Sequence, residues 1–254
     1  MSGALEAGLW GLIGASALVL GGLLAFTVHI PTRVRGLIQG FGAGILFGAV
    51  AYELVEEAVD AHAGGFAVGI GFGLGAVVFY LGSVLIDSIP AKGGEPDPDG
   101  GAGAPATGDR RAAGLAVLLG TVLDGIPESV VLGLTFVPGA GVAAPILLAI
   151  FISNVPEAVS ASEDLADSGF SRRRIMRIWI GVTLTSAVAA AIGFAMLDVV
   201  GPRLIVATQA FAAGALLAML AETMIPEGYQ NGGRPVGLAT ALGFALAASL
   251  SLGT

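Results

Sequence analysis

The chain has 254 residues, a formal net charge of −8, no cysteine and no basic block, so disulfides, thiolate metal sites and nucleic-acid binding are not expected. It is 55% hydrophobic and 12% charged, whereas a soluble domain carries about 25% charged residues. Because several uncharged runs reach the roughly 20 residues that cross a bilayer core, the composition excludes an ordinary soluble protein and predicts an all-α integral membrane protein embedded in a lipid bilayer.

The hydrophobic pattern predicts eight transmembrane helices within one domain that spans residues 1–254. The expected helices cover 7–29, 36–60, 65–86, 112–136, 142–165, 175–197, 204–227 and 236–252. The first run is too long, and its flank too acidic, for an ordinary signal peptide. Residues 90–111, between the third and fourth helices, are rich in glycine, proline and aspartate, which is typical of a flexible loop.

The basic residues indicate how the helices are oriented. The chain has 11 Lys and Arg residues, and they gather in alternate loops. With the N-terminus outside, each of them except Arg203 falls on the cytosolic side, as the positive-inside rule requires. This pattern predicts a multi-pass protein of the cell (plasma) membrane with both termini outside, and it places the 90–111 loop in the cytosol.

An internal repeat links the second and seventh predicted helices. Residues 41–46 resemble residues 211–216, and at the same offset of 170 residues Glu57 matches Glu227. The two helices run in opposite directions, and inverted repeats around a binding site are typical of secondary transporters. We therefore expect helices 1–3 and 6–8 to form inverted repeats around helices 4 and 5, a 3+2+3 arrangement. Chance similarity between helices rich in alanine, glycine and leucine is the alternative.

Two polar motifs with a shared pattern interrupt the fourth and fifth helices. They read DGIPE at residues 124–128 and SNVPE at residues 153–157. Each proline removes one helical hydrogen bond and frees a carbonyl oxygen, and carboxylates at such depth are costly unless they serve a function. Residues three or four positions apart face the same way on a helix. The predicted cation ligands are Asp124, Glu128, Ser153, Asn154 and Glu157.

These oxygen atoms suit a divalent cation. Three carboxylates held together in lipid repel one another, and a divalent cation cancels that repulsion. A polar cluster that only joins the helices is the alternative, but serine or threonine would serve that purpose at lower cost. Two further carboxylates extend the predicted cation path. They are Glu53, in the outer part of the second helix, with a helix-end salt contact as its alternative, and Glu222, toward the inner end of the seventh.

The motifs in this topology resemble the ZIP (Zrt/Irt-like) family of divalent metal ion transporters, in the manner of a divergent prokaryotic member. The resemblance covers nearly the whole chain and includes both Pro-Glu motifs, the variable cytosolic loop and the end of helix 7 at residues 222–227. It implies metal transport toward the cytosol along helices 2, 4, 5 and 7. Zn²⁺ is the family's usual cargo, with Mn²⁺, Fe²⁺ and Cd²⁺ as others. A homodimer is also compatible with the family.

The sequence departs from the family pattern at three positions. Asp124 stands where the family has histidine, Gly125 stands where it has asparagine, and Ser186 falls near a helix 6 glutamate that completes a second metal site in some members. We therefore expect a single metal ion in an all-oxygen site. Oxygen ligands shift the preference toward harder cations such as Mn²⁺, Mg²⁺ or Fe²⁺.

Two other classes of function compete with metal transport. An intramembrane metalloprotease needs a His-Glu-x-x-His pattern, and neither His29 nor His62 falls in one, so an enzyme is not expected. A proton or monovalent-cation channel or antiporter could use the same carboxylates and is the alternative function.

Overall fold

The computed structural model describes residues 3–55, 65–88, 107–139, 141–142, 144–199 and 202–251. Within these ranges the chain forms eight helical rods and one isolated β-bridge, between Val137 and Gly141. In chain order the rods are α1 (Gly3–Thr27), α2 (Thr32–Ala49) with the π-helical η1 (Val50–Val55), α4 (Gly65–Asp87), α5 (Thr107–Leu134), α6 (Ala144–Asp167), α7 (Arg172–Val199), α8 (Pro202–Met219) with the π-helical η2 (Leu220–Met224) and α9 (Ile225–Gly232), and α10 (Pro235–Ser251).

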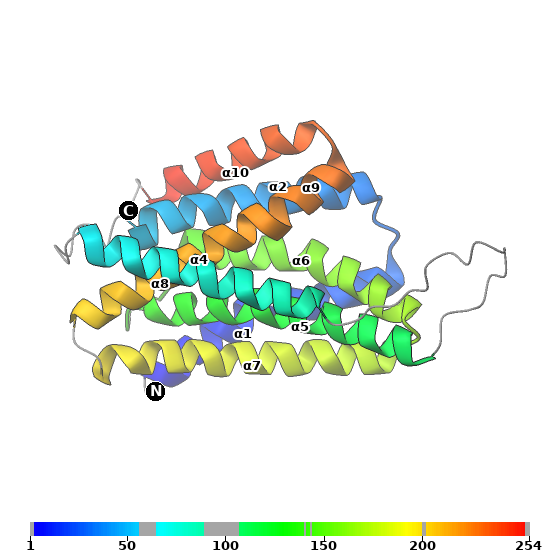
Figure 1. The fold of residues 1–254 in the computed structure, drawn as a ribbon, viewed down its shortest axis with the longest axis horizontal. Helices are drawn as coiled ribbons and strands as arrows, with labels where there is room; N and C mark the ends of the chain where they lie inside the picture. The colour runs from blue at the N-terminus through cyan, green and yellow to red at the C-terminus, as the bar shows by residue number, and fades with distance from the viewer. Residues whose placement is uncertain are drawn as a thin grey trace.

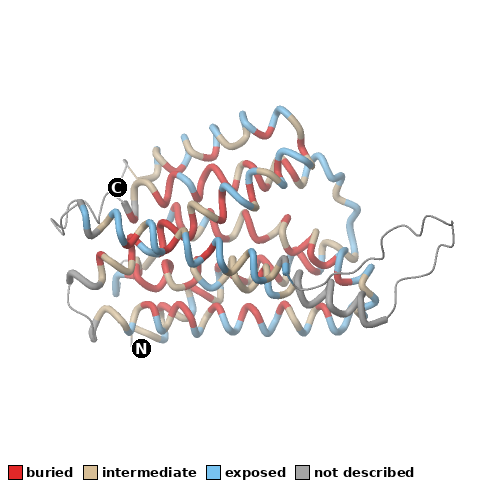
Figure 2. Tube along the Cα trace, viewed as in Figure 1, coloured by how far each residue is buried: buried red, intermediate tan, exposed pale blue. Residues whose placement is uncertain are grey.

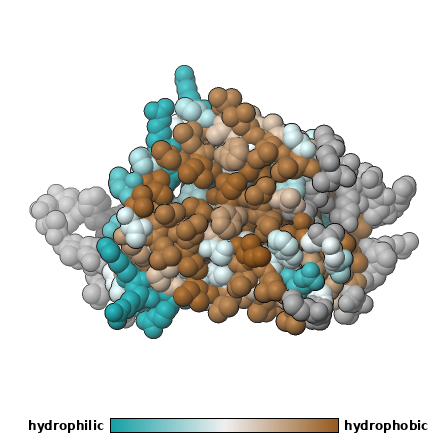
Figure 3. All heavy atoms as spheres, turned by 180° about the vertical axis from the view of Figure 1, so that it is seen from behind, coloured by the Kyte–Doolittle hydropathy of each residue, from teal (hydrophilic) through white to brown (hydrophobic). Residues whose placement is uncertain are grey.

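Six of the described rods are long and apolar enough to cross a membrane. The other two are α10, which has 17 residues, and α5, which carries Asp124 and Glu128. Apolar side chains cover most of the face seen in Figure 3, as is expected where helices meet lipid tails. The chain is therefore an all-α membrane protein, as its composition predicts.

Several helices begin a few residues earlier than the sequence predicts, and α5 shows the largest difference. α5 begins at Thr107, inside the stretch 90–111 that the sequence predicts as a loop, because arginine and alanine there continue the helix beyond the apolar run. The second rod is described to Val55, and the rest of its predicted range, residues 56–60, lies outside the described residues. Residues 56–64 and 89–106, which include most of the predicted loop, lie outside the described residues.

The first three and the last three rods run in opposite directions. In Figure 1, α1 runs opposite to α7, α2 opposite to α8, and α4 opposite to α10. α1 packs along α7, α2 along α10, and α4 along α8. α6 packs against α1 and α2, and α5 packs against α7, so the two helices that carry the polar motifs lie between these pairs.

Glycines allow two of these helix pairs to approach closely. Gly44 of α2 lies against the Thr240 carbonyl of α10, and Gly214 of α8 lies against the Phe72 carbonyl of α4. A Cβ atom at either glycine would collide with the partner backbone. Small residues at such contacts are what membrane helices need in order to pack. The two glycines are separated by the 170-residue offset of the internal repeat.

The two π-helical segments recur at the same spacing. η1 begins at Val50 and η2 begins at Leu220. Short π-helical segments are rare and are frequent at functional sites. Each of them continues a rod that carries glutamates of the predicted cation path, so the same local distortion occurs at equivalent places in two oppositely directed helices.

Two buried apolar clusters fill the space between the rods, and Figure 2 shows buried positions facing the interior. The central cluster joins α2, α5, α6 and α8 and includes Leu46, Leu132 and Leu216. The second cluster surrounds Trp179 of α7, whose Nε1 donates a hydrogen bond to the Oγ atom of Ser162 of α6 at 2.8 Å. These clusters hold α5 and α6 in the middle of the molecule.

The connections α1–α2, α6–α7 and α9–α10 lie at one end of the bundle (Figure 1). Gly3, at the start of α1, and Ser251, at the end of α10, lie toward the opposite end. We name the first the arginine-rich end because Arg33, Arg35, Arg172, Arg173, Arg174, Arg177 and Arg234 are placed at or near these connections.

Candidate functional site

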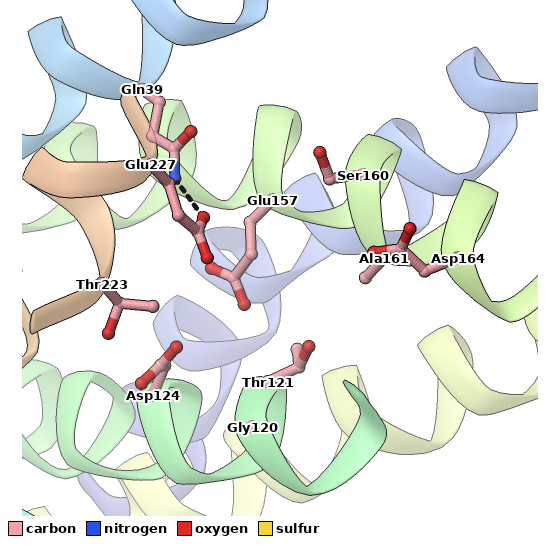
Figure 4. Close-up of a pocket in the computed structure, with 10 residues that line it drawn as sticks. All are labelled: Gln39, Gly120, Thr121, Asp124, Glu157, Ser160, Ala161, Asp164, Thr223 and Glu227. Carbon is pink, nitrogen blue, oxygen red and sulfur yellow. Dashed lines mark hydrogen bonds between the residues drawn. The ribbon is translucent and has the colours of Figure 1, made fainter. Parts of the chain in front are cut away.

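A polar cavity of about 200 Å³ lies between α2, α5, α6 and the η2–α9 segment (Figure 4). Four of its lining side chains are carboxylates, and the other polar ones offer hydroxyl or amide groups. None of the lining side chains is positively charged. The lining residues are Gln39, Gly120, Thr121, Asp124, Glu157, Ser160, Ala161, Asp164, Thr223 and Glu227.

α5 presents Thr121 and Asp124 to this cavity. The two residues lie one turn apart and share a face of the helix, and both side chains point toward the cavity in Figure 4. The helix continues through Pro127. Proline has no N–H to donate, so the carbonyl of Leu123 lacks its usual helical partner beside Asp124. The predicted ligand Asp124 is therefore placed at the cavity wall.

α6 supplies the facing wall. Glu157, Ser160 and Asp164 recur at helical spacing and share one face. The Glu157 carboxylate interacts with the Thr121 hydroxyl across the cavity, and in Figure 4 it lies in the space between α5 and α9. The structure thus brings Asp124 and Glu157, one from each Pro-Glu motif, to the same cavity.

Gln39 and Glu227 are among the polar cavity residues that the predicted ligands do not include. Gln39 Nε2 of α2 donates a hydrogen bond to Glu227 Oε2 of α9 at 2.8 Å, which joins the two helices across one side of the cavity. The signal for Glu227 is a third Pro-Glu pair, Pro226–Glu227, and the signal for Gln39 is a lone amide within an apolar run.

The carboxylates around the cavity repel one another. Electrostatic repulsion acts between Asp124 and Glu227, between Glu128 and Asp124, and between Glu157 and the other three. Glu128 is 3% exposed and lies behind the cavity rather than in its lining. Carboxylates gathered around one cavity inside an apolar bundle are stabilised by a bound cation or by protons, so the cavity is suited to bind a cation.

Ser153 and Asn154 also lie behind the cavity. They are 1% and 4% exposed. The Ser153 hydroxyl donates a hydrogen bond to the Ile150 carbonyl of its own helix at 3.2 Å, and Gly42 of α2 packs against the Ser153 backbone. In this conformation Ser153 therefore lies at a helix contact, Asn154 is buried, and neither of these two predicted ligands lines the cavity.

Of the two outlying predicted ligands, Glu222 does not line the cavity. Glu222 lies on η2, is exposed, and accepts a hydrogen bond from the Ser83 hydroxyl of α4 at 2.9 Å. The backbone of Glu53 belongs to η1, and its side chain lies outside the described residues. A role for either residue on a cation path stays a prediction.

The carboxylates share a cavity without forming a tight cluster. Within the described part of the chain, no three histidine, aspartate or glutamate side chains converge closely enough to hold a metal ion. Asp124, Glu157 and Glu227 come from three separate elements, so relative movement of those elements changes the spacing of the ligands. The structure therefore shows an acidic chamber rather than a preformed coordination sphere.

The cavity lies nearer to the arginine-rich end. Asp164, one turn before the end of α6, is exposed, and we name Ser160, Glu163 and Asp164 the cavity mouth. Farther along the bundle, residues of the central cluster, including Leu132 and Ile146, fill the space between the same helices. The chamber is thus open toward the arginine-rich end and closed by apolar packing toward the other.

The sequence is similar to that of a plant protein. No family model matches the sequence. A protein of Arabidopsis thaliana, named as a candidate zinc transporter, is 27% identical to this chain over 242 residues. The match covers 94% of this chain and 37% of the relative, so the chain spans little more than a third of that protein's length.

Proposed function

We propose that this chain is a carrier that moves divalent metal cations across a cell membrane toward the cytosol, through the cavity between α2, α5, α6 and α9. The observation that carries the proposal is the set of four carboxylates lining one cavity in an otherwise apolar bundle. Ionisable groups within membrane-spanning bundles mark ion pathways. The helical membrane fold and the likeness to a transporter-like relative point to a transporter rather than an enzyme.

Membership of the ZIP family is part of this proposal. The match along 94% of the chain supports it, and so do the two Pro-Glu motifs on neighbouring helices. The 3+2+3 arrangement with inverted repeats is supported by equivalent contacts whose carbonyl residues are 170 positions apart and whose glycines are 168 positions apart. The Phe41 carbonyl of α2 meets Gly243 of α10, and the Phe211 carbonyl of α8 meets Gly75 of α4. The opposite directions of the first and last three rods (Figure 1) agree with such repeats.

The direction of transport rests on the arginines. Under the positive-inside rule the arginine-rich end faces the cytosol, which puts both termini outside and opens the cavity inward. The closed, apolar half of the bundle then faces the outside, as in a carrier that has turned its site toward the cytosol. Residence in the cell (plasma) membrane and a homodimer stay predictions.

Asp124, Glu157 and Glu227 are the proposed ligands that meet the cargo in this conformation, with Gln39 positioning Glu227. Glu128 adds negative charge directly behind them. Zn²⁺ is the cargo that the relative's name supports. The lining offers oxygen atoms and the Gln39 amide but no imidazole, which suits Mn²⁺ or Fe²⁺ at least as well, so both classes of metal belong in the first assay.

One observation favours the alternative, a proton or monovalent-cation pathway. Because no tight acidic triad forms among the described side chains, the chamber could pass ions that need little direct coordination. Such a pathway would use the same carboxylates but would show cation or proton flux that divalent metals do not compete with.

Uptake into liposomes tests the proposal. Purified protein should take up Zn²⁺, Mn²⁺ or Cd²⁺, and Glu157→Gln and Asp124→Asn should each lower uptake at least about tenfold, equivalent to ~1.4 kcal/mol of lost cation stabilisation. Glu6→Gln on α1, a carboxylate that does not line the cavity, is the matched control. Metal uptake that survives both cavity substitutions contradicts the site, and proton flux without any metal uptake supports the alternative.

A further inference from the structure

Arg35 places a positive charge beside the mouth of an acidic cavity. It lies near the start of α2, and its side chain is 12% exposed. Its Nη1 atom donates to Glu163 Oε2 at 2.7 Å and to Ser160 Oγ at 3.2 Å, and its charge acts on Asp164. Ser160 and Asp164 line the cavity, so the guanidinium contacts one cavity residue and acts electrostatically on another.

Helix pairing alone does not explain this arrangement. Arg35 Nε is buried and has no hydrogen-bond partner among the described residues, which a purely structural contact would avoid. The Glu163 side chain is 45% exposed, and ion pairs open to water contribute little to stability. Arg35–Glu163 is also the one salt bridge that forms between described residues.

The backbone beneath Arg35 is fixed to α9. Gly36 packs against the Gly228 carbonyl and the Gly232 backbone so closely that a Cβ atom would not fit. α9 also carries the cavity residue Glu227. Arg35 therefore extends from a rigid α2–α9 unit to α6, and its ion pair crosses the mouth from one wall of the cavity to the other.

We propose that Arg35 sets how tightly the cavity mouth holds a cation, so that the cargo is released there rather than retained. A guanidinium does not lose its charge in a protein. Its fixed positive charge occupies Glu163 and opposes the attraction of Asp164 for a divalent cation. Without the Arg35 charge, the cavity mouth would form a second binding site for the transported cation. Arg35 is thus a positioning residue that acts through these carboxylates, and the inference rests on the proposed cation transport.

The test is a charge series measured by Mn²⁺ binding to the purified full chain and by Mn²⁺ uptake into liposomes. Arg35→Gln should bind Mn²⁺ about tenfold more tightly, equivalent to ~1.4 kcal/mol, and should transport it more slowly because release is slower. Glu163→Gln frees the guanidinium and should weaken binding. The double variant restores the net charge of the mouth and should return binding to near the wild-type value.

Two further variants separate charge from structure. Arg35→Lys keeps the positive charge and should bind Mn²⁺ like the wild type, whereas Arg33→Gln removes an exposed charge on the same turn and should change neither readout.

Weakened binding in all Arg35 and Glu163 variants, together with lower melting temperatures, would show a structural role and overturn the proposal. If the wild type binds Mn²⁺ but the Arg35 and Glu163 variants bind and transport it as the wild type does, this inference alone fails. If the wild type binds none of Mn²⁺, Zn²⁺ and Cd²⁺, the proposed function fails and this inference with it.

Discussion

At the scale of single residues, the cavity is lined by some side chains that the sequence predicts as ligands and by others that it does not. Helical spacing predicts that Asp124 and Glu128 share a face, and both are near the cavity, yet Thr121 rather than Glu128 completes its lining. Spacing says which residues face the same way, but it does not say how far that face is rotated relative to the neighbouring helix. Glu227 is outside the predicted ligand set for a related reason, since only the fold shows that α9 lines the same cavity as α5 and α6.

Replacement of Gln39 by leucine should weaken cation binding. The Gln39 amide holds Glu227 Oε2 at 2.8 Å, and the loss of a hydrogen bond to a charged group costs about 1.5–3 kcal/mol. Leucine leaves Glu227 free to turn away from the cavity and to repel Glu157. We expect KM for metal uptake to rise about tenfold while the maximal rate changes less.

Gln230→Leu is the matched control for this prediction, because Gln230 is an exposed amide on α9 and does not line the cavity. A KM that is unchanged in Gln39→Leu, measured by uptake into liposomes at several metal concentrations, would show that Gln39 does not position a ligand.

At the scale of helices, apolar runs predict where the rods are, and glycines explain how they pack. All eight predicted helices correspond to described rods, because long apolar segments in a bilayer have few structural alternatives. The bounds are less predictable. The start of α5 at Thr107 depends on the helix propensity of residues that the hydropathy pattern assigns to a loop. The π-helical turns at Val50 and Leu220 leave no mark in that pattern either.

Gly44→Leu should destabilise the protein, and Gly237→Leu should not. Gly44 lies against the Thr240 carbonyl, so a side chain there forces α2 and α10 apart, whereas a Cβ atom at Gly237 meets open space. Overpacking costs typically about 1–3 kcal/mol. Thermal unfolding in detergent should show a lower midpoint for Gly44→Leu alone, and equal midpoints for the two variants would contradict the packing argument.

At the scale of the whole molecule, charge and cavity agree about sidedness. The arginines cluster at the end toward which the cavity opens, while the central cluster closes the other half. The sequence predicts the first of these facts, because loop charges are local. It does not predict that the central cluster closes the other half. An apolar residue such as Leu132 gives the same sequence pattern whether it blocks a pathway or lines an open one.

Introduced cysteines test this sidedness, because the chain has none of its own. Ser171 lies in the α6–α7 connection and Pro138 in the α5–α6 connection, and both are exposed. In intact cells a membrane-impermeant maleimide should label Pro138→Cys, whereas Ser171→Cys should react only after the membrane is opened. Asp164→Cys, at the cavity mouth, should follow Ser171→Cys, since the cavity opens toward that end. Leu132→Cys should resist the reagent from both sides, because its side chain is buried in the central cluster.

Labelling of Pro138→Cys and Ser171→Cys from the same side would contradict the proposed topology. Reaction of Leu132→Cys from the outside would instead show that the apolar half opens, and the closed state described here would then be one of two.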